Sequence, residues 1–175
     1  MAKKQSKKIV GLIVALVVVL VGGVLFVGAV SGWFSDTRVK IDAEFYCEEG
    51  CEEFTDLSVG DYEELIAKKK SFIVFVDQGG CTTADRLRGY VVDWARENGV
   101  KVMRIMFEDM RETSLHDYVK YYPSVALVSK GKVMRWLKAD SDEDADEYND
   151  YTVFREWLDS GIFLVENKKI VNENA

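Results

Sequence analysis

The chain has 175 residues, 48% of them hydrophobic and 12% aromatic, enough for one folded domain with a further segment attached. Four of the 23 basic residues and none of the 30 acidic residues precede residue 31, so residues 31–175 carry a net charge of −11. This charge argues against nucleic acid and anionic lipid headgroups as partners of the domain.

The N-terminal residues predict a membrane anchor. Residues 1–8 are basic, and residues 9–30 form an uncharged apolar run of 22 residues, which can cross a hydrocarbon core of about 30 Å. Because the lysines precede this run, we expect a single-pass protein of the cell membrane with a cytoplasmic N-terminus and an extracytoplasmic domain. A cleaved signal peptide is the competing interpretation, but the run exceeds the usual apolar region of about 7–15 residues, which favours a retained signal-anchor.

Residues 31–53 are rich in charge and predict a juxtamembrane linker that holds two of the three cysteines, Cys47 and Cys51. In an oxidising compartment the pair can form a disulfide, because Gly50 allows the turn that brings the two residues together. A structural disulfide is the simpler interpretation and a redox-active pair is the alternative. A zinc site is disfavoured, since the chain has a single histidine.

A folded domain is predicted from residue 54 to residue 161, and residues 162–175 form a tail without an assigned structure. A short strand near residues 54–57 precedes a helix with a capping-box start at Asp61 and a basic end at residues 68–70.

A single cysteine follows the next strand. Residues 72–76 are all β-formers, Asp77-Gln78-Gly79-Gly80 ends the strand, and Cys81 then opens a segment of helical period. The start of a helix favours thiolate over thiol, so this position predicts a nucleophilic cysteine. The alternative is that Cys81 is only a small, half-buried cap residue.

The remaining elements follow from periodicity and turn residues. We expect a helix that closes at Asn98-Gly99, followed by a strand over 100–107 whose methionines lie in the core. A short helix over 114–120 then turns Leu115, Tyr118 and Val119 inward. A β-hairpin over 124–137 and an amphipathic helix that ends at Gly161 complete the domain. His116 is expected on the surface, without a catalytic role.

An acidic segment, residues 139–150, lies between the hairpin and the last helix. Its spacing of Asp140, Asp142 and Asp144 is similar to a calcium loop, but Ala145 and Tyr151 stand where that loop needs glycine and glutamate. We interpret it as a solvated acidic loop.

The order β-α-β-α-β-α-β-β-α predicts an α/β domain with a mixed sheet and helices on both faces. With the Gly79-Gly80-Cys81 turn at a helix start and Pro123 directly before a strand, residues 54–161 resemble the thioredoxin-like fold family. The resemblance implies that Cys81 is the first cysteine of the family's C-x-x-C motif, that Ala84 replaces the second, and that Tyr122-Pro123 is a cis bond close to Cys81 where family members bind an extended substrate.

Two functions follow from this resemblance. One is thiol–disulfide exchange through Cys81, in which a protein or peptide disulfide is the substrate and a partner thiol completes the reaction. The other is a non-catalytic binding or scaffold module that holds a membrane-protein partner, since a fold does not imply a function. No cofactor and no metal are expected, and an accessible, reactive Cys81 thiol would favour exchange.

Overall fold

The computed structural model describes residues 38–47 and 54–164. Five strands form its main sheet in the order β2-β4-β3-β5-β6. Their bounds are β2 Thr55–Asp56, β3 Phe72–Asp77, β4 Val102–Met106, β5 Ser124–Ser129 and β6 Lys132–Trp136. The strands β2, β4 and β3 are parallel, whereas β5 is antiparallel to β3 and to β6. The predicted mixed sheet is confirmed.

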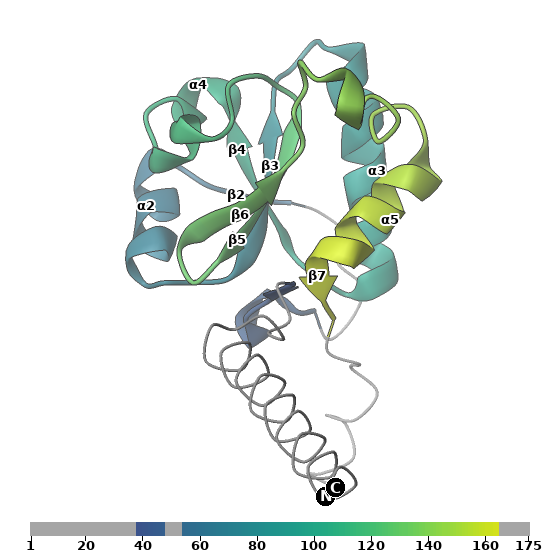
Figure 1. Cartoon of the computed structure of the whole chain (residues 1–175). Helices are drawn as coiled ribbons and strands as arrows, with labels where there is room; N and C mark the ends of the chain where they lie inside the picture. Colours follow the sequence, from purple (N-terminus) through teal and green to yellow (C-terminus); the bar gives the residue numbers. More distant parts are fainter. Residues whose placement is uncertain (1–37, 48–53, 165–175) are drawn as a thin grey trace, which may run out of the picture. The chain divides into compact units, whose positions relative to one another are not determined.

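Helices cover both faces of this sheet. Figure 1 shows α2 and α4 on one side and α3 and α5 on the other. Their bounds are α2 Val59–Ala67, α3 Thr82–Asn98, α4 Phe107–Met110 and α5 Tyr151–Gly161, with short 3-10 turns at η1 Ala43–Phe45, η2 Ser114–Asp117 and η3 Asp142–Asp144. The observed order from β2 to α5 is the order that the sequence predicted, except that the helix between β4 and β5 is α4 and not the predicted helix over 114–120.

The central strand β3 anchors the core, because all six of its residues are buried. Tyr62 of α2 packs edge-on against Phe72, with ring centroids 6.1 Å apart. On the other face, the indole N–H of Trp94 donates to Asp159 Oδ1 at 2.8 Å, which ties α3 to α5. Helices α2 and α3 each bury an apolar stripe against the sheet, on opposite faces.

Part of the predicted linker belongs to this folded unit. Strand β1, Val39–Lys40, pairs in parallel with β7, Ile162–Phe163, to form a separate two-stranded sheet. Val39, Ile41 and Phe45 are buried in the core. The domain thus extends beyond residues 54–161 at both ends, because apolar residues scattered among charges pack onto a core that the local composition does not show.

Three local predictions were wrong in detail. Helix α2 starts earlier than Asp61: Ser58 is the N-cap, and Asp61 is the third helical residue of its capping box. Strand β4 ends at Met106, which is 39% exposed, and Phe107 begins α4. Tyr118 is 40% exposed rather than inward, because the predicted helix over 114–120 is only a 3-10 turn. Periodicity does not distinguish such short turns from helices.

No helix within residues 38–47 and 54–164 combines the length and hydropathy that a membrane crossing needs. The predicted cytoplasmic residues 1–8 and the predicted span, residues 9–30, lie outside the described residues.

Candidate functional site

Cys81 occupies the N-cap of α3, directly after the turn that ends β3. Its backbone is extended, and its side chain makes no capping hydrogen bond. The thiol is free, and the residue is half-buried. Gly80 has φ +77°, a conformation that favours glycine, so the turn that leads into Cys81 depends on it. The structure therefore presents one partly accessible thiol at the start of a 17-residue helix.

Ala84 lies one turn into α3 and is completely buried. It stands where the resemblance implies a second cysteine. The side chains of Thr82 and Thr83, in contrast, are exposed. Cys81 therefore has no thiol beside it on its own helix.

The loop before β5 leaves the sheet at the same end as the Cys81 turn. Val76 lies opposite Ser124 in the antiparallel register, so Asp77 and Pro123 follow at one edge of the sheet. The Tyr122-Pro123 bond is cis, which confirms that prediction. The close approach of Cys81 and Pro123 stays a prediction.

Pro123 is buried, and Tyr122 is not. The hydroxyl of buried Tyr148 donates to the Pro123 carbonyl at 2.9 Å, and burial raises the pKa of Tyr148. The Tyr122 ring packs on Phe107, with centroids 4.6 Å apart. The loop is thus held from both sides.

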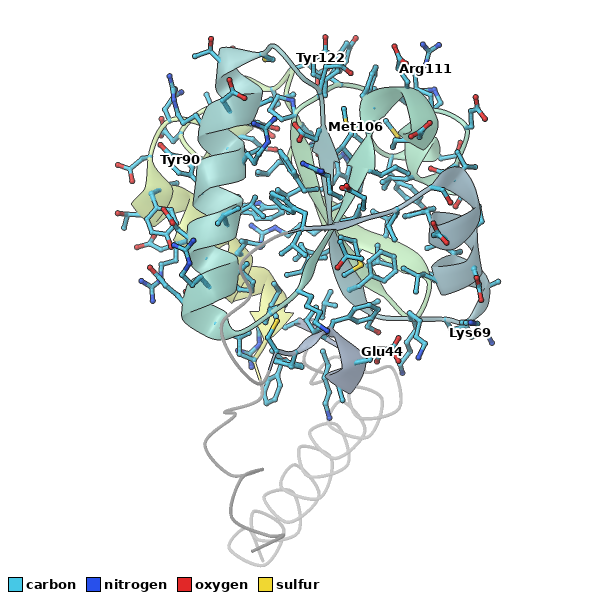
Figure 2. All side chains as sticks on the ribbon, turned by 180° about the vertical axis from the view of Figure 1, so that it is seen from behind. Glu44, Lys69, Tyr90, Met106, Arg111 and Tyr122 are labelled. Atoms are coloured by element: carbon cyan, nitrogen blue, oxygen red, sulfur yellow. The ribbon has the colours of Figure 1, made fainter. Side chains whose placement is uncertain are left out.

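Large apolar side chains remain exposed around this loop. They are Met106, Tyr118, Tyr121 and Tyr122. Figure 2 shows Tyr122 and Met106 toward one end of the domain, away from Glu44 and Lys69. Exposed aromatic side chains are frequent in binding sites, and Tyr121 and Tyr122 belong to the loop that contains Pro123.

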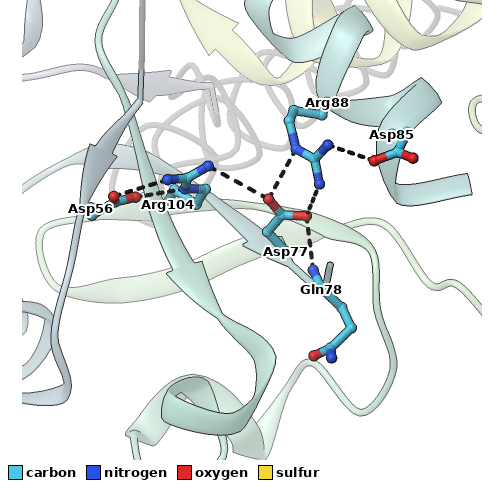
Figure 3. Close-up of polar contacts among 6 residues, drawn as sticks. All are labelled: Asp56, Asp77, Gln78, Asp85, Arg88 and Arg104. Atoms are coloured by element: carbon cyan, nitrogen blue, oxygen red, sulfur yellow. Dashed lines mark hydrogen bonds and ion pairs between the residues drawn. The ribbon is translucent and has the colours of Figure 1, made fainter. Parts of the chain in front are cut away.

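A charged network lies beneath the Cys81 turn, and the sequence analysis missed it (Figure 3). The carboxylate of Asp77 is 3% exposed, and Arg88 of α3 donates to it from Nε at 3.0 Å and from Nη2 at 2.7 Å. Arg104 of β4 lies 3.8 Å from Asp77 and makes two hydrogen bonds to Asp56. Two arginines thus compensate one buried carboxylate.

The network connects four elements, namely β2, β3, β4 and α3, at the end of the sheet. Hydrogen bonding to Asp77 raises the pKa of Arg88, and hydrogen bonding to Arg104 lowers the pKa of Asp56. Asp77 also accepts from the backbone N–H of Gln78 at 2.8 Å, at the start of the turn toward Cys81. In the sequence, one feature could have indicated this network: Asp77 is an acid at the end of an apolar strand, and a buried acid needs a partner.

Cys47 lies far from this site. It is disulfide-bonded, and its backbone N–H donates to the Gly99 carbonyl at 2.9 Å. Gly99 is the C-cap of α3, whereas Cys81 is its N-cap. A helix of this length spans roughly 25 Å. The structure therefore separates Cys47 from Cys81, and Cys51 lies outside the described residues.

His116 is half-buried in η2 rather than on the surface. Its Nδ1 is shielded and has no hydrogen-bond partner among the described residues. Within the same residues, no cluster of three or more histidine, cysteine, aspartate or glutamate side chains could hold a metal ion.

The combination of features decides the fold. A mixed sheet with helices on both faces places a cysteine at a helix start and a cis-proline loop at one end, as the resemblance implied. The chain has a thioredoxin-like fold. No protein-family model matches it, and no curated protein matches it either.

Similar solved structures include a mutant thioredoxin and a protein named Trxlp. A mutant thioredoxin from Halobacterium salinarum NRC-1 has 15% identity and a TM-score of 0.47, with 65% of this chain and 95% of that chain covered. Trxlp from Edwardsiella tarda EIB202 has 13% identity and a TM-score of 0.46, with 61% and 98% covered. The thioredoxin-like domain is assigned from its own strand order and element sequence.

Proposed function

We propose that this chain is a membrane-anchored, extracytoplasmic thioredoxin-like protein that carries out thiol–disulfide exchange through Cys81. The observation that carries the proposal is the free, partly accessible thiol at the N-cap of α3. The membrane anchor rests on the apolar run of residues 9–30 and on the lysines that precede it.

The reaction needs an external partner for its second half. The Cys81 thiolate attacks one sulfur of a substrate disulfide, the substrate S–S bond breaks, and the other sulfur leaves as a thiolate. A mixed disulfide between Cys81 and the substrate remains. Because Ala84 carries no thiol, an external thiolate then attacks the mixed disulfide and restores the Cys81 thiolate.

The exposed residues around Pro123 support a peptide substrate. Tyr121 and Tyr122 flank the cis-proline loop and offer aromatic surface. Such rings bind an extended segment with little loss of side-chain freedom. We therefore expect Tyr122→Ala to weaken substrate binding, while the reaction of Cys81 with a small disulfide is unchanged.

The experiment is a trapping measurement on the full-length chain. A peptide disulfide is added, and the intact mass is measured before and after glutathione. We expect one peptide adduct per chain, its complete release by glutathione, and no adduct on Cys81→Ser. An unmodified native chain after long incubation would reject exchange. Protease added to intact cells tests the topology, and protection of the whole chain would reject an extracytoplasmic domain.

The second candidate is a binding module without catalysis. Buried Ala84 favours it, because the site has lost the thiol that would release a trapped substrate. In that case Cys81→Ser would retain full partner binding, and the trapping experiment would give no adduct.

A further inference from the structure

One residue of the acidic segment 139–150 lies inside the domain and holds the loop before β5. Tyr148 is 6% exposed, and its hydroxyl donates to the Pro123 carbonyl at 2.9 Å. Burial raises the pKa of Tyr148, so the hydroxyl stays protonated and remains a donor at neutral pH. A buried donor and acceptor are costly to separate, because each would lose its only partner. The hydrogen bond therefore fixes the Pro123 carbonyl in place.

Asn149, the next residue, holds helix α3. Its Oδ1 accepts from Arg86 Nη1 at 2.5 Å, and its backbone carbonyl accepts from the Tyr90 hydroxyl at 3.1 Å. Its Nδ2 donates to the Ala145 carbonyl at 2.8 Å, which fixes the side chain within its own segment. Arg86 and Tyr90 lie in the half of α3 that follows Cys81. Two adjacent residues thus hold the two elements that carry the candidate site.

The segment that carries these two residues is itself fixed near both ends. Asp144 Oδ2 accepts from the backbone N–H of Lys138 at 2.7 Å, shortly after β6. Asp150 is the N-cap of α5, and its side chain accepts from the N–H of Thr152 at 2.7 Å. The two residues between these contacts are therefore held by the sheet and by α5.

The backbone of Tyr122 is the part of the loop that is open to a ligand. Within residues 38–47 and 54–164, neither its N–H nor its C=O takes part in a backbone hydrogen bond. The next peptide group contains the Pro123 carbonyl, and the proline ring restricts rotation between the two groups. The hydrogen bond from Tyr148 therefore also orients the backbone of Tyr122.

We propose that Tyr148 and Asn149 are positioning residues for a peptide substrate: this pair, the clamp, sets the place of the Tyr122 backbone relative to Cys81 and thereby the affinity for an extended peptide. The inference rests on the proposed function, in which that backbone and Cys81 act on the same substrate. A small disulfide reaches Cys81 without the loop and depends little on the clamp.

The first measurement is binding without chemistry. The probe is a fluorescein-labelled octapeptide of alternating valine and serine with one central S-methylcysteine, followed by anisotropy on the full-length chain in mild detergent. We expect saturable binding, and an affinity about fivefold lower for Tyr148→Phe, which removes one hydrogen bond and keeps the ring. The matched control is Tyr62→Phe, which removes the hydroxyl of another buried tyrosine and is expected to change the affinity less than about twofold.

A second variant tests whether the two residues act together. Asn149→Ala breaks the contact with Arg86 at an exposed position and is expected to weaken binding as well. Residues that act as one unit are not additive, so we expect the double variant Tyr148→Phe/Asn149→Ala to lose less affinity than the product of the two single losses. A loss equal to that product would mean two independent effects and would overturn the clamp.

The second measurement separates the clamp from the proposed function. The same octapeptide with a central cysteine, presented as its symmetric disulfide, is compared with hydroxyethyl disulfide as a substrate of Cys81. We expect Tyr148→Phe to slow the reaction with dilute peptide about fivefold and the reaction with hydroxyethyl disulfide less than about twofold.

Three results would overturn the clamp: equal slowing with both disulfides, no binding of the S-methyl peptide by the native chain, or unchanged binding in Tyr148→Phe. A native chain that forms no adduct would reject exchange. If that chain still binds the S-methyl peptide, and Tyr148→Phe still weakens the binding, the clamp is supported as part of a binding module.

Discussion

Cys47 and Cys81 lie at opposite ends of helix α3. The backbone N–H of Cys47 donates to the Gly99 carbonyl just after the helix, while Cys81 is the residue just before it. Exchange requires contact between a thiolate and a sulfur atom, and the helix spans roughly 25 Å. Within one chain, the two cysteines therefore cannot exchange directly in this structure.

The first prediction follows from this separation. Cys81→Ser is expected to leave the reduction potential and the reduction rate of the Cys47 disulfide unchanged, because that disulfide does not meet Cys81. Reduction is followed with a dithiol of known potential, and Thr82→Ser serves as the matched neighbour variant. A shift specific to Cys81→Ser would join the cysteines into one redox unit and contradict the geometry.

The second prediction restores the missing thiol. Ala84→Cys places a sulfur one helical turn from Cys81, where the Cα atoms of residues three apart lie within the distance of about 7 Å that a disulfide allows. We expect an intramolecular disulfide and catalytic reduction of insulin by dithiothreitol, at least tenfold faster than for the native chain. The disulfide is detected by intact mass as a loss of two hydrogens. The rate of insulin reduction is measured by the turbidity of the reduced insulin.

Thr83→Cys is the control for the second prediction. It adds a thiol to the same helix turn at an exposed position, two residues from Cys81. We expect no internal disulfide and no gain in insulin reduction. Equal gains in both variants would mean that any added thiol suffices and that the spacing is irrelevant.

The sequence predicted the strands of the sheet and the position of Cys81 better than it predicted the contacts between residues far apart in the chain. Strand β3 could be predicted because it is a run of apolar residues that stops at Asp77. The Gly79-Gly80-Cys81 turn could be predicted as well, because glycines next to each other are a local signal for a turn. The pairing of β1 with β7 could not be predicted from the sequence, because each strand has only two residues and the two strands are more than 120 positions apart, at residues 39–40 and 162–163. Likewise, an acid at position 77 shows the need for a partner and not which arginine supplies it.

The third prediction concerns that partner. Arg88→Ala leaves the nearly buried carboxylate of Asp77 with the more distant Arg104 as its remaining ion-pair partner. We expect a loss of about 2–3 kcal/mol in the free energy of unfolding, because the buried carboxylate loses the two hydrogen bonds that Arg88 donates to it. Urea denaturation measures the change. Arg96→Ala breaks a surface pair with Asp93 on the same helix and is expected to cost less than about 1 kcal/mol.

The fourth prediction is a pH dependence at the start of α2. The Asp61 carboxylate accepts from the Ser58 N–H at 3.0 Å and from the Ser58 hydroxyl at 2.6 Å. These hydrogen bonds to Ser58 lower the pKa of Asp61 below its ordinary value of 3.8. An acid with a lower pKa in the folded chain contributes stability above its unfolded pKa and loses it as the pH falls through the folded value.

Asp61→Asn should therefore be less stable than the native chain at pH 6, and the difference should shrink as the pH falls below about 4. The urea midpoint of both proteins, measured between about pH 6 and about pH 2.5, tests this. Glu156→Gln, which removes an exposed acid from α5, is expected to show no such convergence. A midpoint difference that stays constant over the whole range would mean that the Asp61 side chain stabilises α2 through its shape rather than through its charge.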